Sequence, residues 1–315
     1  MALPQSLNPP LTPTDTSQSL LGWTMVSVAT LAYSIAAPIV RWAILDGMNP
    51  TTLLMVRMVM TTALLGGSLA LFAPSKLKID RRGFWIAILA GAVNGTGFLT
   101  FFWSLKRLDA SISAMLFSLA PLVILGMLAL RGEKLTYRHL IRLGLGLAGV
   151  YFLIGPGGDV DLMGVLLVGL GIITFSFQLV ILQWYLKDYD GWTITFYILA
   201  AITVDVIIWW LIQGREWHDP GVDGWMAIFI LAIVSTFLAR LAMFASVRYI
   251  GGGQTALFMP LETLLTVVWS IFFLDEKLSL LQWVGGGLIL ASVVLAVQRL
   301  RFTKARFRWR RSTRI

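Results

Sequence analysis

Four ionisable side chains lie within stretches that are otherwise almost wholly apolar: Arg57, Asp205, Arg240 and Glu262. A charge at the bilayer centre costs at least about 2.5–3.5 kcal/mol on insertion scales, and such residues face a bundle interior or a water-filled cavity. Arg240 could bind a carboxylate or phosphate through its bidentate fork. Glu262, in the middle of TALFMPLETLLTVVWSIFF (255–273), could carry a proton because burial disfavours the ionised form. Alternatively, Arg240 and Glu262 neutralise each other as a permanent ion pair that fixes helix packing.

Spacing along the chain sets the expected depth of these residues. Arg240 and Glu262 are each 11 residues from Gly251. At about 1.5 Å of rise per residue, both lie about 16 Å from that turn, near the bilayer midplane. Asp205 lies at a similar expected depth, so the three could form a ring. Arg57 is expected about 10 Å below the outer surface, where it could snorkel outward, and we expect a structural or gating role for it.

Polar and aromatic residues in other apolar stretches could line the same cavity. Asn94 is the strongest hydrogen-bonding group of the third stretch, and Tyr33 lies close to Pro38 in the first. Prolines locally break membrane helices, and such breaks occur at binding sites. We therefore expect gating or structural roles for Pro38, Pro121 and Pro260. Small polar residues elsewhere in these helices are more often packing residues.

The composition places these residues in a membrane. Of the 315 residues, 57% are hydrophobic and 13% are charged, about half the charged fraction of a soluble domain. Continuous runs of about 20 apolar residues span a bilayer as helices and argue against a β-barrel. There is no cysteine, and His139 and His218 lie in polar loops. We therefore expect no metal site or other cofactor, and no enzymatic activity.

Internal similarity organises the apolar segments. Shifting the chain by 142 residues brings Trp42 onto Trp184 and, after one inserted residue, Glu133 onto Glu276. A shared Leu and Gly content is the alternative explanation. These glutamates, each followed by lysine, are expected to pair and cap within their own turns. The predicted membrane-spanning helices are at about 22–42, 51–73, 83–105, 110–130, 137–155, 162–186, 192–212, 224–248, 253–274 and 280–298.

Each copy holds an odd number of helices, so the second must enter the membrane upside down relative to the first. We therefore predict an all-α membrane protein of ten transmembrane helices, arranged as two inverted five-helix repeats. The predicted parts are a disordered N-terminal tail (1–20), the first repeat (21–156), the second repeat (160–298) and a basic C-terminal tail (299–315).

The distribution of basic residues predicts the orientation. Lys and Arg are more frequent in the loops on the same side as the basic tail, which places both termini in the cytoplasm and the chain in the cell's inner membrane. The net charge of +9 comes largely from this tail. It therefore predicts contact with anionic lipid head groups rather than with nucleic acid.

Several motifs, in order and spacing over residues 20–298, resemble the EamA-like drug/metabolite transporters. NPTTLLMVR (49–57) looks like the Pro-then-Arg opening of that family's second helix. Its helix 3–4 hairpin is similar to SLKRLDASISAMLFSLAPLVILGMLALRGEKLT (104–136) and to SVRYIGGGQTALFMPLETLLTVVWSIFFLDEKLS (246–279). The second copy departs from the pattern at Thr263 and at AspGlu (275–276). The resemblance implies a carrier that uses the proton-motive force or exchange, often an exporter of amino acids or related metabolites.

We therefore expect a secondary transporter that exports small polar or amphipathic metabolites, such as amino acids, by alternating access around a central cavity. Glu262 could couple this transport to protons. An importer or exchanger of anionic metabolites, such as nucleotide or sugar phosphates, is the first alternative, and a non-transporting membrane receptor or assembly protein is the second. The candidate substrate-binding residues are Arg240, Glu262, Asn94, Tyr33 and Asp205.

Overall fold

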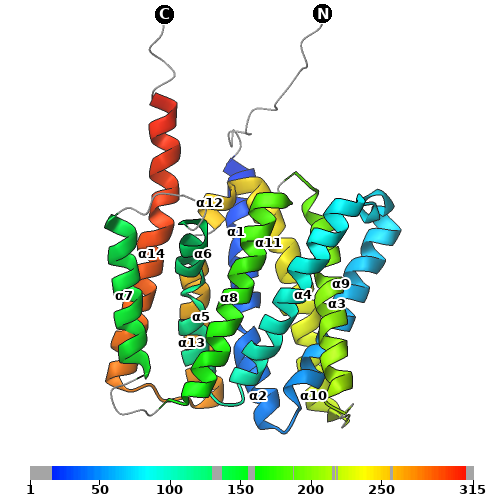
Figure 1. Ribbon diagram of the computed structural model, residues 1–315, viewed down its shortest axis with the longest axis horizontal. Coiled ribbons are helices and arrows are strands. Elements are labelled where there is room, and N and C mark those ends of the chain that lie inside the picture. The colour runs from blue at the N-terminus through cyan, green and yellow to red at the C-terminus, as the bar shows by residue number, and fades with distance from the viewer. Residues whose placement is uncertain are drawn as a thin grey trace, which may run out of the picture.

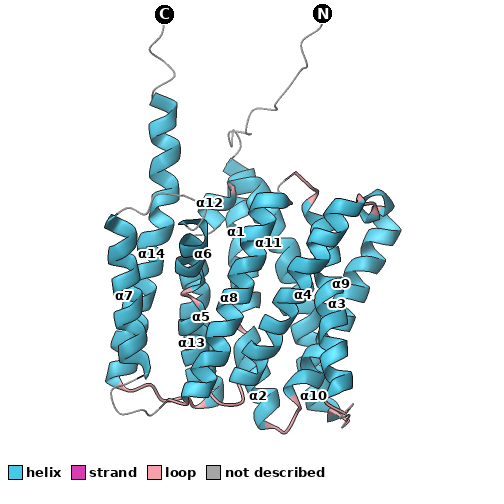
Figure 2. Cartoon of the chain, in the orientation of Figure 1, coloured by secondary structure: helices cyan, strands magenta, loops and turns pink. Residues whose placement is uncertain are grey.

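The computed structural model describes residues 16–129, 137–154, 160–186, 188–214, 217, 219–255 and 258–309. Throughout these residues the regular structure is helical, and no strand occurs among them (Figure 2). The predicted N-terminal tail up to residue 15, the turn that contains Glu133 and the last six residues of the predicted C-terminal tail lie outside the described residues.

Sixteen helical segments follow one another along the described residues. In chain order they are α1 (Thr16–Ser34), α2 (Ala36–Leu45), α3 (Pro50–Phe72), η1 (Pro74–Leu77), α4 (Arg81–Ser104), α5 (Ala110–Phe117), α6 (Ala120–Ala129), α7 (Tyr137–Ile154), α8 (Leu162–Tyr185), α9 (Gly191–Ile212), α10 (Gly221–Phe229), η2 (Ile230–Leu238), α11 (Ala239–Ile250), α12 (Gly252–Thr255), α13 (Met259–Leu274) and α14 (Leu280–Trp309).

The long helices stand side by side in one bundle, and α1 begins at the same end of it at which α14 ends (Figure 1). We call this the terminal end, where α12 lies, and the opposite end, where α2 and α10 lie, the distal end. Among the described residues, seven helical stretches are long and apolar enough to cross a membrane, and three shorter apolar helices accompany them. The helix α14 continues past residue 298, where the sequence predicted a tail.

The first predicted span is broken at Ile35, three residues before Pro38. A proline ring clashes with the carbonyl four residues earlier and removes one helical donor, and here that carbonyl belongs to Ser34. It accepts instead a hydrogen bond from Thr266 Oγ1 on α13, at 2.9 Å. The Ser34 hydroxyl accepts another from the indole N–H of Trp269, at 3.0 Å. The neighbouring helix therefore satisfies the backbone that the proline frees.

The ninth predicted span is also divided. The helix α12 ends at Thr255 and α13 begins at Met259, with Pro260 in its first turn. Proline is favoured there because its missing N–H has no helical partner in any case. Pro121 has the same place in α6, behind a break from α5. Glu262 consequently lies in the N-terminal turn of α13, not in the middle of a long helix as the sequence suggested.

The eighth predicted span is continuous from Gly221 to Ile250, but its middle segment, η2, is wound as a π-helix. Such windings are rare and are frequently found at functional sites. The hydroxyl of Thr236 donates to the carbonyl of Leu231, five residues earlier, at 2.7 Å. Nothing in the amino-acid pattern of this apolar segment predicted the change of winding.

Helices from the two halves of the chain pack on one another. The helix α4 lies against α8 and α9, α1 against α11, and α7 against α14. Glycine permits the closest approaches: a Cβ at Gly97 of α4 would collide with Thr174 Oγ1 of α8, and one at Gly149 of α7 would lie 2.7 Å from the carbonyl oxygen of Gly285 of α14. The bundle therefore depends on contacts between the halves.

Candidate substrate site

Four of the predicted residues come together inside the bundle: Tyr33 of α1, Arg57 of α3, Arg240 of α11 and Glu262 of α13. The guanidinium of Arg240 lies beside the Tyr33 hydroxyl, which also lies within electrostatic range of Glu262 and Arg57. Arg57 in turn lies within electrostatic range of Arg240. We call these four residues the central cluster.

Irregular helix geometry surrounds the central cluster. Tyr33 lies next to the break between α1 and α2, Arg240 follows directly after η2, and Glu262 lies in the first turn of α13. The first turn of a helix carries partial positive charge, and transporter sites are typically built where membrane helices are discontinuous. The local structure here is therefore of the kind that binds charged groups.

Arg57 points into the protein and is 6% exposed. Its Nε and one terminal nitrogen donate to Thr236 Oγ1, at 3.1 and 2.9 Å, and its guanidinium lies 5.7 Å from the ring centroid of Phe102. The expected outward snorkelling of Arg57 is therefore wrong, because η2 offers an acceptor inside the bundle. Sequence reasoning missed Thr236, whose only signal was a hydroxyl within an apolar run.

The ion pair that the sequence allowed between Arg240 and Glu262 does not form. The ion pairs of the described residues all lie at the ends of the bundle, and none includes either residue. Arg240 is directed to Tyr33, and its Nε is buried without an acceptor. Glu262 is half-buried, and its backbone carbonyl accepts a hydrogen bond from Thr266 Oγ1 at 3.0 Å.

Asp205 and Asn94 lie apart from the central cluster. Asp205 of α9 is half-buried against α4, where its carboxylate is 3.5 Å from Thr96 Oγ1 and faces Gly95. The possible ring of Asp205 with Arg240 and Glu262 is therefore not formed, although their chain spacing allowed it. Asn94, one residue before Gly95, is 3% exposed within the bundle.

The space beside the central cluster is small. A cavity of about 10 Å³ is lined by Thr61, Leu65, Trp192, Leu199, Thr236, Phe237 and Arg240. This is room for roughly one water molecule, so helices must separate before a metabolite can reach Arg240 from this side. A larger, open hollow of about 640 Å³ lies on α10 and contains no member of the central cluster.

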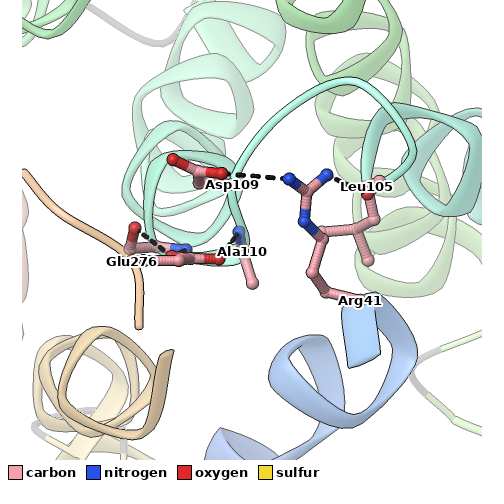
Figure 3. A network of polar contacts seen from close by, with 6 residues as sticks. Arg41, Leu105, Asp109, Ala110 and Glu276 are labelled. Carbon is pink, nitrogen blue, oxygen red and sulfur yellow. Dashed lines mark hydrogen bonds and ion pairs between the residues drawn. The ribbon is translucent and has the colours of Figure 1, made fainter. Parts of the chain in front are cut away.

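Glu276 at the distal end binds the start of α5 (Figure 3). Its carboxylate is 8% exposed and accepts hydrogen bonds from the backbone N–H groups of Ala110 and Ser111, at 2.7 and 3.0 Å, and from the Ser111 hydroxyl, at 2.5 Å. A carboxylate at a helix N-terminus satisfies free donors and opposes the helix dipole. Capping within its own turn was therefore the wrong expectation, because Glu276 caps a helix in the other half of the chain.

Arg41 of α2 completes this distal network (Figure 3). One terminal nitrogen donates to the carbonyl of Leu105 at 2.6 Å, and the other forms an ion pair with Asp109 at 3.0 Å. Close by in the chain, Arg107 forms an ion pair with Asp161 at 2.8 Å. The turn between α4 and α5 is thereby joined to α2 and to the start of α8.

Polar contacts at the terminal end fasten η1 to the start of α9. Lys76 and Asp190 lie 3.4 Å apart, and the Thr193 hydroxyl donates to the Lys76 carbonyl at 2.7 Å. The hydroxyl of Tyr189 donates to Asp80 and holds the pKa of that exposed carboxyl below its usual value. Both ends of the bundle are thus held by charged groups that have partners.

Comparison with known proteins identifies the family. The chain belongs to the EamA-like transporter family, whose model matches residues 20–155 and 162–298. It is 25% identical over 193 residues to an uncharacterized transporter of Archaeoglobus fulgidus, covering 61% of this chain and 69% of the relative. It is 20% identical over 292 residues to the uncharacterized transporter YcbK of Bacillus subtilis, covering 86% of this chain and 90% of YcbK.

A solved crystal structure with 20% sequence identity shares the fold, with a TM-score of 0.60 over 91% of this chain and 99% of that one. The family resemblance in the sequence is therefore confirmed. Together with the apolar helices, it makes this chain a multi-pass membrane protein of a transporter family.

Proposed function

We propose that this protein is a secondary transporter that exports small polar or amphipathic metabolites bearing a carboxylate, amino acids among them, by alternating access around the central cluster. The observation that carries the proposal is Arg240. It is a cation deep in a bundle of a transporter family, beside Tyr33 but without an ion-pair partner among the described residues. Retaining such a charge in a membrane favours a functional role.

The architecture that fits this proposal has ten membrane-spanning helices in two inverted repeats. Seven long and three shorter apolar helices among the described residues support that number. The helices α1 and α8, which begin the two copies, run in opposite directions in Figure 1. The start of α1 and the end of α14 at one end of the bundle suit an even number of crossings. The Lys/Arg excess supports a cytoplasmic terminal end in the inner membrane. The basic end of α14 then meets anionic lipid head groups.

Proton coupling is assigned to Glu262. Its carboxylate has no cationic partner among the described residues, and it lies within electrostatic range of Tyr33. It can therefore gain or lose a proton without breaking an ion pair. Asn94 and Asp205, which lie on helices α4 and α9, are proposed to line the cavity when the helices separate.

The test is flux from liposomes that contain the purified protein and a mixture of labelled metabolites, with and without a pH gradient. We expect selective loss of some labels, loss of the gradient's effect in Glu262→Gln, and a strong reduction of flux in Arg240→Gln. Arg248→Gln is the matched control, because Arg248 is exposed on the same helix. Equal turnover by the Arg240→Ala, Glu262→Gln double variant would contradict the site, and absence of selective flux would favour a receptor or assembly protein.

Import or exchange of an anionic metabolite is the second candidate function. Two guanidinium groups within electrostatic range of one another favour it, since phosphates and carboxylates both bind arginine forks. Competition by nucleotide or sugar phosphates, without competition by amino acids, would select this function over the first.

A further inference from the structure

The central cluster has an excess of positive charge in either protonation state of its carboxylate. It contains two cationic guanidinium groups, Arg57 and Arg240, and one carboxylate, Glu262. Among the described residues, the charged groups that act on Tyr33 are these three alone. The positive charges therefore outnumber the negative ones whether Glu262 is ionised or neutral. An uncompensated charge buried in a bundle is unfavourable.

The two arginines are not equivalent. Arg57 directs two nitrogens at the hydroxyl of Thr236 and lies over the ring of Phe102, so it is fixed by the protein. Arg240 lies beside the Tyr33 hydroxyl, and its Nε is buried without an acceptor. Neither arginine has a carboxylate within ion-pair distance among the described residues. Arg240 is therefore the cation with donor capacity left for a ligand.

The chemistry of neighbouring groups favours an oxyanion at Arg240. The Tyr33 phenol can donate its O–H hydrogen bond to such a group, beside the donors of Arg240. A zwitterion could place its own cation near Glu262, but the charge of Arg57 would then remain uncompensated. A ligand with net negative charge removes that excess. Charge compensation therefore separates net anions from zwitterions of the same size.

We propose that the central cluster selects small organic anions, whose carboxylate or phosphate oxygens bind Arg240 and Tyr33, over zwitterions and cations of similar size. This inference rests on the proposed function and narrows its substrate class. An acidic amino acid, a dicarboxylate or a phosphate monoester fits it, whereas a neutral amino acid does not. Arg57 acts as a positioning residue that supplies positive charge without touching the ligand.

The experiment measures equilibrium binding to the purified full-length protein by titration calorimetry, using pairs that differ in charge but little in size. The pairs are aspartate and asparagine, succinate and succinamide, and glycerol 3-phosphate and glycerol. We expect the anionic member of at least one pair to bind about tenfold more tightly, which corresponds to about 1.4 kcal/mol. The carboxylate pairs and the phosphate pair together identify which oxyanion is preferred.

Variants assign the binding to the cluster. Arg240→Gln should weaken anion binding about tenfold or more. Arg240→Lys should weaken it less, because it keeps the positive charge and loses only the bidentate geometry of the guanidinium. Tyr33→Phe should weaken it moderately. Arg248→Gln should leave it unchanged, and monodisperse elution of each variant checks its folding.

Tighter binding of asparagine than of aspartate, saturable binding of no anion, or unchanged binding in Arg240→Gln would overturn the inference. Selective flux of zwitterions would overturn the inference while leaving the transporter intact. Specific anion binding without flux would instead overturn the proposed function and leave the anion site standing.

Discussion

The distal network and the central cluster use the same residue types in opposite ways. At the distal end, Glu276 has donors for both carboxylate oxygens. Arg41 has a carboxylate and a carbonyl as acceptors for its two terminal nitrogens, although its Nε, like that of Arg240, is buried without an acceptor. In the central cluster, Arg240 and Glu262 have no ion-pair partner among the described residues. A buried charge with its partners supplied stabilises the assembled bundle, whereas one without them lowers stability and is available to a ligand.

This contrast relates the position of a charged residue in the bundle to its role in stability or in binding. The distal contacts join segments far apart in the chain, as Glu276 does with α5, and so hold one arrangement of the helices. The central groups lie beside a helix break, a π-helix and a helix start, where small changes of winding reorient side chains. Substitutions at the distal end should therefore alter stability, and those in the centre should alter binding.

The largest stability loss is expected for Glu276→Ala. It leaves the N–H groups of Ala110 and Ser111 and the Ser111 hydroxyl without their acceptor, which should cost about 3 kcal/mol. The measurement is thermal unfolding of the detergent-purified protein. Glu276→Gln keeps one acceptor and should lose less. Arg240→Gln serves as the central counterpart and should leave the unfolding temperature unchanged or raised; an equal loss in both positions would remove the distinction between the two regions.

A smaller loss is expected for Thr236→Val. The variant keeps the shape of the side chain but removes the acceptor of two Arg57 hydrogen bonds, which should cost about 2 kcal/mol. Unfolding temperature and anion affinity should both fall, because Arg57 would be free to turn away from its position. Thr236→Ser retains the hydroxyl and is the matched control. Wild-type behaviour of Thr236→Val would show that η2 does not fix Arg57.

A loss of about 1 kcal/mol is expected for Thr266→Val, in line with hydrogen bonds between membrane helices. The Ser34 carbonyl, released by Pro38, would lose the donor that lies 2.9 Å away. Thr266→Ser should restore stability. Pro38→Ala in the Thr266→Val background should also recover part of the loss, since the carbonyl could again accept a helical hydrogen bond. No recovery in either would contradict this account of the break.

The smallest effect is expected at the exposed pair of Arg107 and Asp161. The hydrogen bond from Arg107 holds the pKa of the Asp161 carboxyl below its usual value. The folded-state pKa is lowered, so the stabilisation is present above the unfolded value of about 4 and is lost as the pH falls through the folded value. Wild type and Asp161→Asn should therefore differ slightly in unfolding temperature at neutral pH and converge in acid. A difference that grows in acid would contradict the sign.

Much of the fold could be predicted because bilayer physics constrains sequence strongly. Apolar runs predicted the helices. The order of the motifs predicted the family, which the match to the family model confirms. The rise per residue predicted similar depths for Arg240 and Glu262, and both lie near Tyr33 in the structure. The depth of a residue along its helix does not determine, however, in which direction its side chain points around the helix axis. This is why Asp205, at a similar expected depth, lies against Gly95 and Thr96 rather than beside Arg240.

The pairing of charges could not be predicted, for two physical reasons. The side chain of Arg240 follows a π-helical segment whose winding has no sequence signature here, and Glu262 starts a helix rather than occupying its middle. The partner of Glu276 lies 165 or 166 residues away, beyond any local capping rule. Long-range contacts of this kind are decided by tertiary packing, which a single sequence does not display.

The π-helix η2 has a consequence for how two similar halves can differ. The offset of 142 residues holds from Asp46 and Asp188 to Ser104 and Ser246, so the segment 230–238 has a counterpart of equal length at 88–96. That counterpart lies within α4 and is an ordinary α-helix. The two copies thus differ in winding without any inserted or deleted residue. A protein built from two repeats can therefore acquire a binding site in one repeat through substitutions alone. The two repeats keep equal lengths and can still pack on one another.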